Sequence, residues 1–250
     1  MNLYKSLKEE YVKSGFCLVK SFFTNDEIED LDETLKKFLN EKSHNLKGKD
    51  INKTKNNQVN TMHDIDKHED YFKKFSQKKK ILDLAAFLLE SDAEFRKCEM
   101  FAKPAKVGMA SPMHQDNYLW AIKNNNGLTF WVALDHCDQT NGGLTYITCS
   151  HTKGLLEHED SFAPGTSQKI KKKILEDQLS NLKVVTPVLE RGDVLIHHCL
   201  TVHGSNVNTS SQNRRGFTIQ FKDKKSVYDE DLLKHYQNRL QAQLRLRNQI

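Results

Sequence analysis

Cysteine is scarce and scattered in this sequence. There are five cysteines and no CxxC pair among them: Cys17, Cys98, Cys137, Cys149 and Cys199. An odd number of widely separated cysteines argues against a disulfide framework or a zinc cluster. Free thiols of this kind fit a reducing compartment.

Long hydrophobic runs are also absent from the sequence. No stretch of about 18 apolar residues occurs, and the opening segment, MNLYKSLKEEYVKSGF, has no apolar core of the signal-peptide kind. We therefore expect a cytoplasmic protein with no membrane partner.

The positive charge of the chain is only slightly in excess. The formal net charge is +5 and the isoelectric point is near 8.8, with lysine runs at 78–80 and 171–173. Such runs are typical of solvated faces. Since basic and aromatic residues do not interleave, we expect no nucleic-acid partner, and we expect a monomer or a weak homo-oligomer.

The first 93 residues are predicted to be mainly helical. Thr24 and Glu27 form a capping-box pattern before apolar residues at helical spacing. Residues 15–19 predict a short strand, 41–58 a mobile loop, and 81–89 a buried helix.

Residues 94–222 predict a β-rich core. Short β-prone segments alternate there with turn residues, and the predicted strands are Glu94–Ala102, Thr129–Asp135, Leu144–Thr148, Lys183–Val188, Asp193–His198 and Gly216–Lys222. Residues 151–182 form a long polar insertion, which we interpret as a lid. A C-terminal helix is expected within 223–250. We predict one domain over residues 1–250, mainly β, with the helices packed on a β-barrel.

The pattern His-x-Asp occurs four times, but only His114-Gln115-Asp116 lies at the rim of the β region among apolar and aromatic residues. If the backbone is extended there, positions i and i+2 point to the same side and both side chains can reach one ion. Two His and one carboxylate on one face of an iron leave coordination positions open for oxygen chemistry.

The third ligand has three candidates in the sequence. His203 is favoured over His197 and His198, which fall within a predicted strand, because Ser205 and Arg214 follow His203 at usable distances. A guanidinium near the metal could bind a carboxylate in bidentate fashion.

In combination, these residues resemble the phytanoyl-CoA dioxygenase family of Fe(II)- and 2-oxoglutarate-dependent oxygenases. The resemblance covers most of the chain through the motifs Gly15-Phe16, Lys103-Pro104, His114-Gln115-Asp116, Trp131, Asn141-Gly142-Gly143-Leu144, Ser150-His151, Arg191-Gly192-Asp193, His203-Gly204-Ser205, Asn208 and Arg214. One departure is Thr148-Cys149, where the family often has Pro-Gly. The family implies a double-stranded β-helix, a cupin-like jelly roll, buttressed by N-terminal helices.

The resemblance also implies roles for individual residues. His114, Asp116 and His203 would bind Fe(II), and Arg214 and Ser205 would hold the distal carboxylate of 2-oxoglutarate. Trp131 and Lys103 would lie at the cosubstrate pocket, and the substrate walls suggested by the sequence are Asn60, His63, Tyr118 and Trp120.

The expected activity is O2-dependent hydroxylation of a small molecule, with release of succinate and CO2. Two alternatives stay open at this point. One is a jelly-roll protein that binds a metal or ligand without turnover, and the other is a cupin-like enzyme that uses its metal without a cosubstrate.

Overall fold

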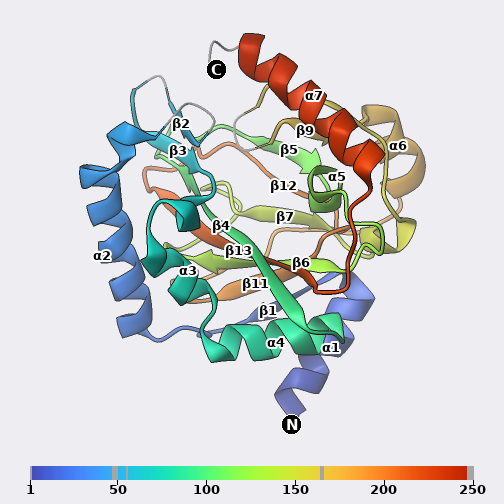
Figure 1. Ribbon diagram of the computed structural model, residues 1–250, viewed down its shortest axis with the longest axis horizontal. Coiled ribbons are helices and arrows are strands. Elements are labelled where there is room, and N and C mark those ends of the chain that lie inside the picture. Colours follow the sequence, from blue (N-terminus) through green and yellow to red (C-terminus); the bar gives the residue numbers. More distant parts are fainter. Residues whose placement is uncertain (1, 47–49, 55, 164–165, 247–250) are drawn as a thin grey trace.

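Helices occupy most of the first 93 residues of the computed structural model, which describes residues 2–46, 50–54, 56–163 and 166–246 (Figure 1). Their bounds are α1 Asn2–Ser14, α2 Asn25–Glu41, α3 Asp70–Ser76 and α4 Lys79–Leu89. The predicted capping box is confirmed. Thr24 Oγ1 accepts a hydrogen bond from the Glu27 amide at 3.2 Å, and the Glu27 carboxylate accepts one from the Thr24 amide at 3.0 Å.

Two antiparallel sheets form the centre of the fold. The larger has the order β1-β11-β6-β13-β4-β3-β2, and the smaller has the order β10-β7-β12-β5. Their strands are β1 Phe16–Val19, β2 Ile51–Lys53, β3 Val59–Met62, β4 Ala93–Lys103, β5 Ser111–His114, β6 Gly127–Ala133, β7 Leu144–Ile147, β10 Val184–Val185, β11 Val194–His198, β12 His203–Ser205 and β13 Arg214–Asp223. The predicted jelly roll with flanking helices is thus confirmed.

The N-terminal segment supplies more than helices, because β1, β2 and β3 all join the larger sheet. The strand β2 lies within the predicted loop 41–58, of which 47–49 and 55 fall outside the described residues. Its three residues pair only with β3 at the sheet edge. Such a short, polar edge strand has no alternating pattern strong enough to be predicted.

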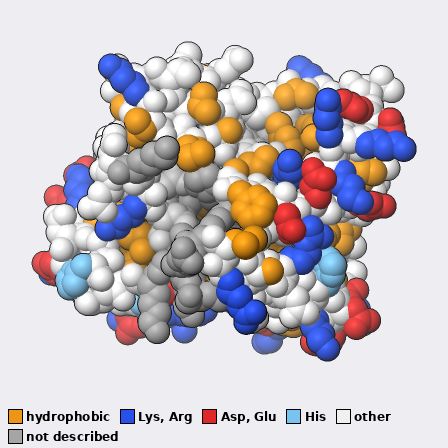
Figure 2. Space-filling view, turned by 90° about the horizontal axis from the view of Figure 1, so that it is seen from above, with side chains coloured by type: hydrophobic (Ala, Val, Ile, Leu, Met, Phe, Trp, Pro, Cys, Tyr) orange, Lys and Arg blue, Asp and Glu red, His pale blue; other side chains and the backbone are white. Residues whose placement is uncertain are grey.

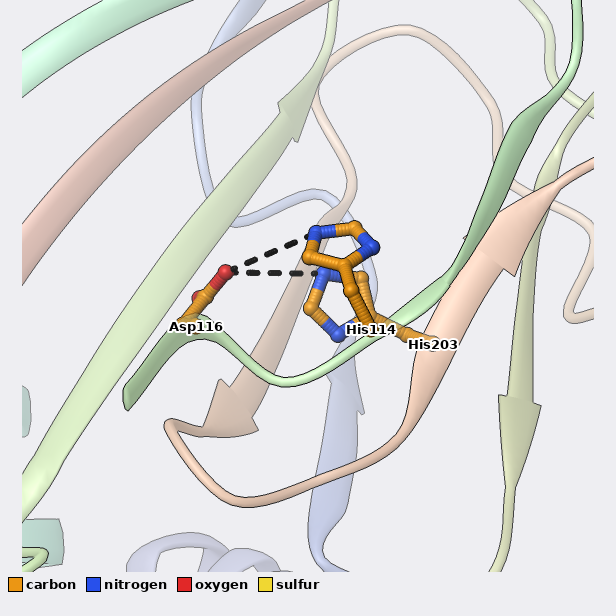
Figure 3. A group of neighbouring side chains, drawn as sticks. All are labelled: His114, Asp116 and His203. Carbon is orange, nitrogen blue, oxygen red and sulfur yellow. Dashed lines mark ion pairs between the residues drawn. The ribbon is translucent and has the colours of Figure 1, made fainter. Parts of the chain in front are cut away.

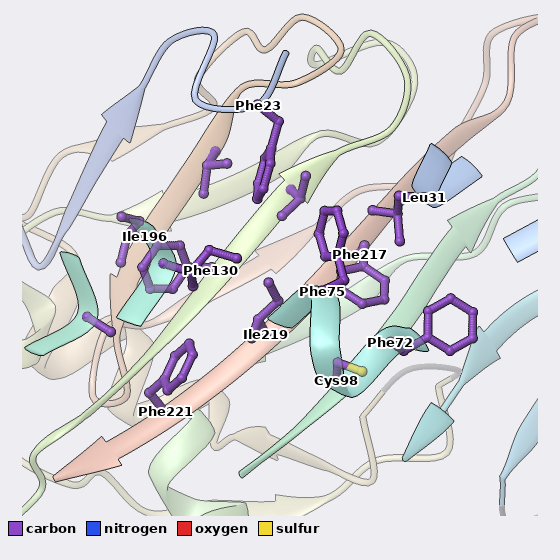
Figure 4. Packing of buried hydrophobic residues seen from close by; sticks show 14 of the residues in the cluster. Phe23, Leu31, Phe72, Phe75, Cys98, Phe130, Ile196, Phe217, Ile219 and Phe221 are labelled. Carbon is purple, nitrogen blue, oxygen red and sulfur yellow. The ribbon is translucent and has the colours of Figure 1, made fainter. Parts of the chain in front are cut away.

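Helices cover one face of the larger sheet and leave its other face to the site. In Figure 4, Phe217, Ile219 and Phe221 of β13 lie among the buried aromatic and aliphatic side chains of this core. Thr218 and Gln220, which alternate with them, instead line a cavity on the opposite face. The alternation in one strand therefore separates the packing face from the functional face.

The insertion and the C-terminal helix lie on the side of the smaller sheet where β5 is the edge strand. The insertion contains β8 His158–Asp160, β9 Gln168–Ile170 and α6 Lys172–Leu179. The last helix, α7 Glu230–Leu246, is held to β8 because Arg239 and Gln243 both donate to Asp160 at 2.8 Å.

On the face bearing α7, basic and acidic side chains intermingle (Figure 2). Of the helices described, none has the length and apolar character needed to cross a membrane.

Candidate metal centre

The chain turns between the first two residues of the candidate site. His114 ends β5, and Asp116 begins the short helix α5 Asp116–Trp120. The expectation that both residues lie on one extended strand is therefore wrong. The turn is fixed by side chains: Gln115 donates to Leu200 O at 2.7 Å, and Asn117 accepts from the Ile122 amide at 3.1 Å.

His114, Asp116 and His203 nevertheless meet at one point (Figure 3). His203 begins β12 and is the direct strand partner of His114 on β5. One ligand atom from each side chain lies within 4.8 Å of the others. Asp116 Oδ1 is 3.9 Å from His114 Nε2 and 3.7 Å from His203 Nε2. These three residues could therefore hold a metal ion.

The backbone fixes which ring nitrogen each imidazole presents. The Nδ1 atoms lie 2.9 Å from carbonyl oxygens, that of His114 from Pro112 O and that of His203 from Thr201 O. A carbonyl requires Nδ1 to carry the proton, which leaves the Nε2 lone pair free to bind metal. Burial lowers the pKa of both His114 and His203 to about 4, so both rings are neutral at pH 7.

Asp116 is oriented by the larger sheet. Its Oδ2 accepts hydrogen bonds from Thr129 Oγ1 at 2.7 Å and from His197 Nε2 at 3.2 Å, and the other nitrogen of His197 lies 2.9 Å from the Tyr146 hydroxyl. Burial alone would raise the pKa of Asp116, but His203 and His197 hold it well below its ordinary range. The carboxylate is therefore ionised, with Oδ1 facing the two imidazoles.

The rival histidines have other partners. His197 orients Asp116, as described above, and it is not part of the three-residue group. His198 accepts from the Leu200 amide at 3.0 Å, and its ring lies 5.6 Å from that of His151.

A cavity of about 410 Å³ opens beside the three residues. Its lining includes Lys103, Trp131, Ser205 and Arg214, all of which the resemblance placed at a cosubstrate pocket. Arg214 is 2% exposed, and its guanidinium lies 5.4 Å from the centre of the Trp131 ring.

Arg214 is a buried cation without a buried counter-charge. Its Nη2 donates to Gly142 O at 2.9 Å, while its Nε is buried and has no hydrogen-bond partner. Within the described part of the chain, no carboxylate lies within ion-pair distance of it. Burial and the charge of Arg214 lower the pKa of Lys103, its strand partner, to about 6. This end of the cavity thus suits an anionic group such as a carboxylate.

Three of the four predicted substrate residues line the cavity. Asn60, His63 and Trp120 line the cavity, whereas Tyr118 is not among its lining residues and instead stacks on His158 with ring centres 4.2 Å apart. On a strand, Tyr118 and Trp120 would share a face, but on the helix α5 two positions apart means nearly opposite faces.

Sequence reasoning missed the residues that position Asp116. Thr129 and His197 are direct partners across β6 and β11, and this pairing is not visible in either segment alone. Arg96, which also lines the cavity, was missed as well. The signal for it was available, since Arg96-Lys97 places two cations in succession inside a predicted strand.

Comparison with known proteins identifies the family. The family described as phytanoyl-CoA dioxygenase (PhyH) matches residues 11–216. The chain belongs to the phytanoyl-CoA dioxygenase family. Members of this family depend on Fe(II), 2-oxoglutarate and O2. The donor set at 114, 116 and 203 fits Fe(II), and the unpaired guanidinium of Arg214 fits the carboxylate of 2-oxoglutarate.

Individual relatives are similar to this chain at low identity or over only part of its length. Peroxisomal phytanoyl-CoA dioxygenase of Bos taurus is 30% identical over 118 residues, which are 47% of this chain and 35% of that protein. A probable alpha-ketoglutarate-dependent hypophosphite dioxygenase of Stutzerimonas stutzeri is 22% identical over 227 residues, 88% of this chain and 78% of the other. The chain thus spans about a third of the length of the bovine relative.

Solved structures share the fold. The epimerase SnoN, in complex with Fe3+, alpha ketoglutarate and nogalamycin RO, superposes with a TM-score of 0.75 at 19% identity, covering 91% of this chain and 86% of that one. EctD from S. alaskensis, with 2-oxoglutarate and 5-hydroxyectoine, gives a TM-score of 0.72 at 20% identity, covering 86% and 74%.

Proposed function

We propose that this protein is an Fe(II)- and 2-oxoglutarate-dependent dioxygenase that hydroxylates a small molecule. The observation that carries the proposal is the convergence of two neutral imidazoles and an ionised carboxylate in the same cavity as an unpaired buried guanidinium. Fe(II) and 2-oxoglutarate together would supply O2 activation, with succinate and CO2 as products beside the hydroxylated substrate.

His114, Asp116 and His203 would hold the iron, with Asp116 kept in place by Thr129 and His197. Because both imidazoles are neutral and Asp116 is ionised, the three ligands together carry a charge of −1. With Fe(II) bound, the centre would therefore carry one net positive charge.

The residues of this chain would bind the cosubstrate by charge and shape. The guanidinium of Arg214 would receive its distal carboxylate through Nε and Nη groups, with the Ser205 hydroxyl as a second donor. Trp131 would form an apolar wall that excludes water, and Lys103 would add positive charge once an anion is bound.

The substrate is proposed from the cavity rather than from relatives. Relatives named for phytanoyl-CoA and for hypophosphite differ too much in their substrates to choose between them. A volume of about 410 Å³ suits a small organic molecule. The walls come from all three predicted segments, with Asn60 from 1–93, the centre from 94–222 and Tyr236 from 223–250. We therefore propose that these segments act as one catalytic domain.

The test is turnover of 2-oxoglutarate by purified protein with Fe(II) and ascorbate. We expect slow succinate release without substrate, abolished in Asp116→Ala and kept in Asp138→Ala, which alters another His-x-Asp pattern with a half-exposed carboxylate. If neither succinate nor 2-oxoglutarate binding is detected, the protein binds a metal or ligand without turnover. Substrate oxidation that needs no 2-oxoglutarate and persists in Arg214→Ala would instead indicate an enzyme that uses no cosubstrate.

A further inference from the structure

A β-bulge in β4 directs an additional cation into the cavity. The strand pairs Gln220 with Lys97 and Phe221 with Phe95, so Arg96 between them is an extra residue with no partner on β13. Phe95 and Cys98 pack toward the helices, whereas Arg96 and Lys97 both line the cavity. Regular alternation would have placed only one of these two cations there. Bulges are typically used to redirect a side chain of this kind.

The surroundings of Arg96 are those of a binding group without its ligand. Its guanidinium lies 4.6 Å from the centre of the Trp120 ring, and its Nη1 is 3.4 Å from the Tyr228 hydroxyl. Its Nε is buried and has no hydrogen-bond partner. Across the described ranges, no carboxylate lies within ion-pair distance of Arg96.

The neighbouring cation differs in this respect. Lys97 Nζ lies 2.7 Å from Glu99 and 3.5 Å from Asp64, so its charge is balanced within the protein. Glu99 is in turn held by His63 at 2.6 Å and by Gln220 at 2.8 Å. Lys97 is therefore part of a closed network, and the charge on Arg96 is left over.

Arg96 is also separate from the group proposed for the cosubstrate. Arg214 begins β13 and pairs with Lys103, whereas the bulge lies at the other end of the same strand pair, next to Gln220. Arg96 stacks on Trp120 of α5, the helix that begins with Asp116. The cavity thus offers a second guanidinium close to the metal ligands.

We propose that Arg96, stacked on Trp120, binds an oxyanion of the substrate, a carboxylate or a phosphonate, on a small molecule that also has an apolar part. This inference rests on the proposed function and names the substrate class of the same cavity. A planar guanidinium with a free Nε edge matches two oxygens of such a group. Leu240 and Leu244 of α7, which also line the cavity, would face the apolar part.

The experiment measures binding of a matched panel to Fe(II) protein saturated with 2-oxoglutarate under anaerobic conditions. The panel contains small monocarboxylic acids, their phosphonate analogues and their primary amides, and affinity is measured by calorimetry. We expect the tightest binders among the acids or phosphonates, with each amide at least about tenfold weaker. The two acid series separate a carboxylate from a phosphonate preference.

Variants assign the effect to Arg96. Arg96→Gln should weaken the anionic binders about tenfold to a hundredfold while leaving the amides unchanged, and Arg96→Lys should give an intermediate loss. Arg245→Gln, which removes an exposed arginine of α7, is the matched control and should change neither series. The inference is overturned if amides bind the wild-type protein as well as acids do. It is also overturned if Arg96→Gln binds the acids and the amides with wild-type affinity.

The binding of 2-oxoglutarate itself distinguishes the two proposals. If wild-type protein binds 2-oxoglutarate and shows no preference for anions in the panel, only the substrate inference fails. If 2-oxoglutarate does not bind at all, the proposed function fails. If Arg96→Gln loses 2-oxoglutarate and Arg214→Gln keeps it, Arg96 holds the cosubstrate and the inference is wrong.

Discussion

Replacing Arg214 by methionine should separate binding from folding. Burial lowers the pKa of Arg214 to about 10. Since a tenfold change in a protonation constant corresponds to about 1.4 kcal/mol, the buried charge opposes folding by roughly 3 kcal/mol at neutral pH. The sign follows from the direction: a base with a lowered pKa in the folded state is penalised wherever it stays protonated, here below about pH 10.

Methionine also removes favourable contacts of the guanidinium. The bonds to Gly142 O at 2.9 Å and Phe101 O at 3.5 Å, together with the contact to the Trp131 ring, contribute about 1–3 kcal/mol in total. The two effects oppose each other, with a net of about 0–2 kcal/mol in favour of methionine. We therefore expect the free energy of unfolding of ligand-free Arg214→Met to equal the wild-type value or to exceed it by up to about 2 kcal/mol.

The assay is urea unfolding of Fe(II) protein under anaerobic conditions, with and without 2-oxoglutarate. At a ligand concentration about 100 times Kd, the wild type should gain about 2.7 kcal/mol. Loss of two charged hydrogen bonds should raise Kd about a hundredfold, so the gain in Arg214→Met falls to about 0.4 kcal/mol.

The neighbouring arginine provides the control. Arg215 forms ion pairs with Asp32 and with Asp135 at 2.7 Å. Arg215→Met should therefore lose about 2–3 kcal/mol of stability and keep the full gain from 2-oxoglutarate. Two results would refute the reasoning: a ligand-free Arg214→Met as unstable as Arg215→Met, which makes Arg214 structural, or an Arg214→Met that retains the wild-type gain.

Three further predictions concern the same cavity. Burial and Arg214 lower the pKa of Lys103 to about 6, and a bound dianion should raise this pKa. The affinity for 2-oxoglutarate should therefore fall as pH rises above about 6. Calorimetry in buffers of different ionisation enthalpy should detect proton uptake on binding in the wild type but not in Lys103→Met. Thr129→Val removes a bond to Asp116 and should weaken Fe(II) binding about tenfold, measured by competition with a chelator; unchanged affinity would contradict the role given to this hydroxyl. In Gly216→Ala the new Cβ would lie 2.0 Å from the Trp131 ring, so thermal unfolding should show a loss of about 1–3 kcal/mol, and 2-oxoglutarate affinity should fall because the indole is displaced.

Much of the fold follows from local pattern. Neighbouring residues alone predict three of its elements: the capping box at Thr24, the apolar alternation in β13 and the apolar helix α4. What the sequence did not reveal depends on contacts between distant segments. The edge strand β2 exists because β3 pairs with it, and the bulge at Arg96 exists because β13 is one residue shorter over the same span.

The candidate site shows the same division. His114 could be proposed because apolar and aromatic residues surround its His-x-Asp motif, and His203 because Ser205 and Arg214 follow it. The helical turn after Gln115 could not, since it is stabilised by carbonyl groups at Gly154 and Leu200, far along the chain. The position of Tyr118 just after the His-x-Asp motif suggests a substrate wall, whereas the helix directs this side chain to His158.

That turn explains how one carboxylate can belong to both sheets. His114 and His203 are paired in the smaller sheet, and Thr129 and His197 are paired in the larger sheet. Asp116 lies between the pairs, with Oδ2 on the larger sheet and Oδ1 facing the imidazoles. An extended backbone would keep Asp116 in line with His114 on one sheet, so the helical turn is what brings the carboxylate across. Any movement between the sheets would then alter the distance between carboxylate and imidazoles, which makes the packing of the jelly roll itself a determinant of metal affinity.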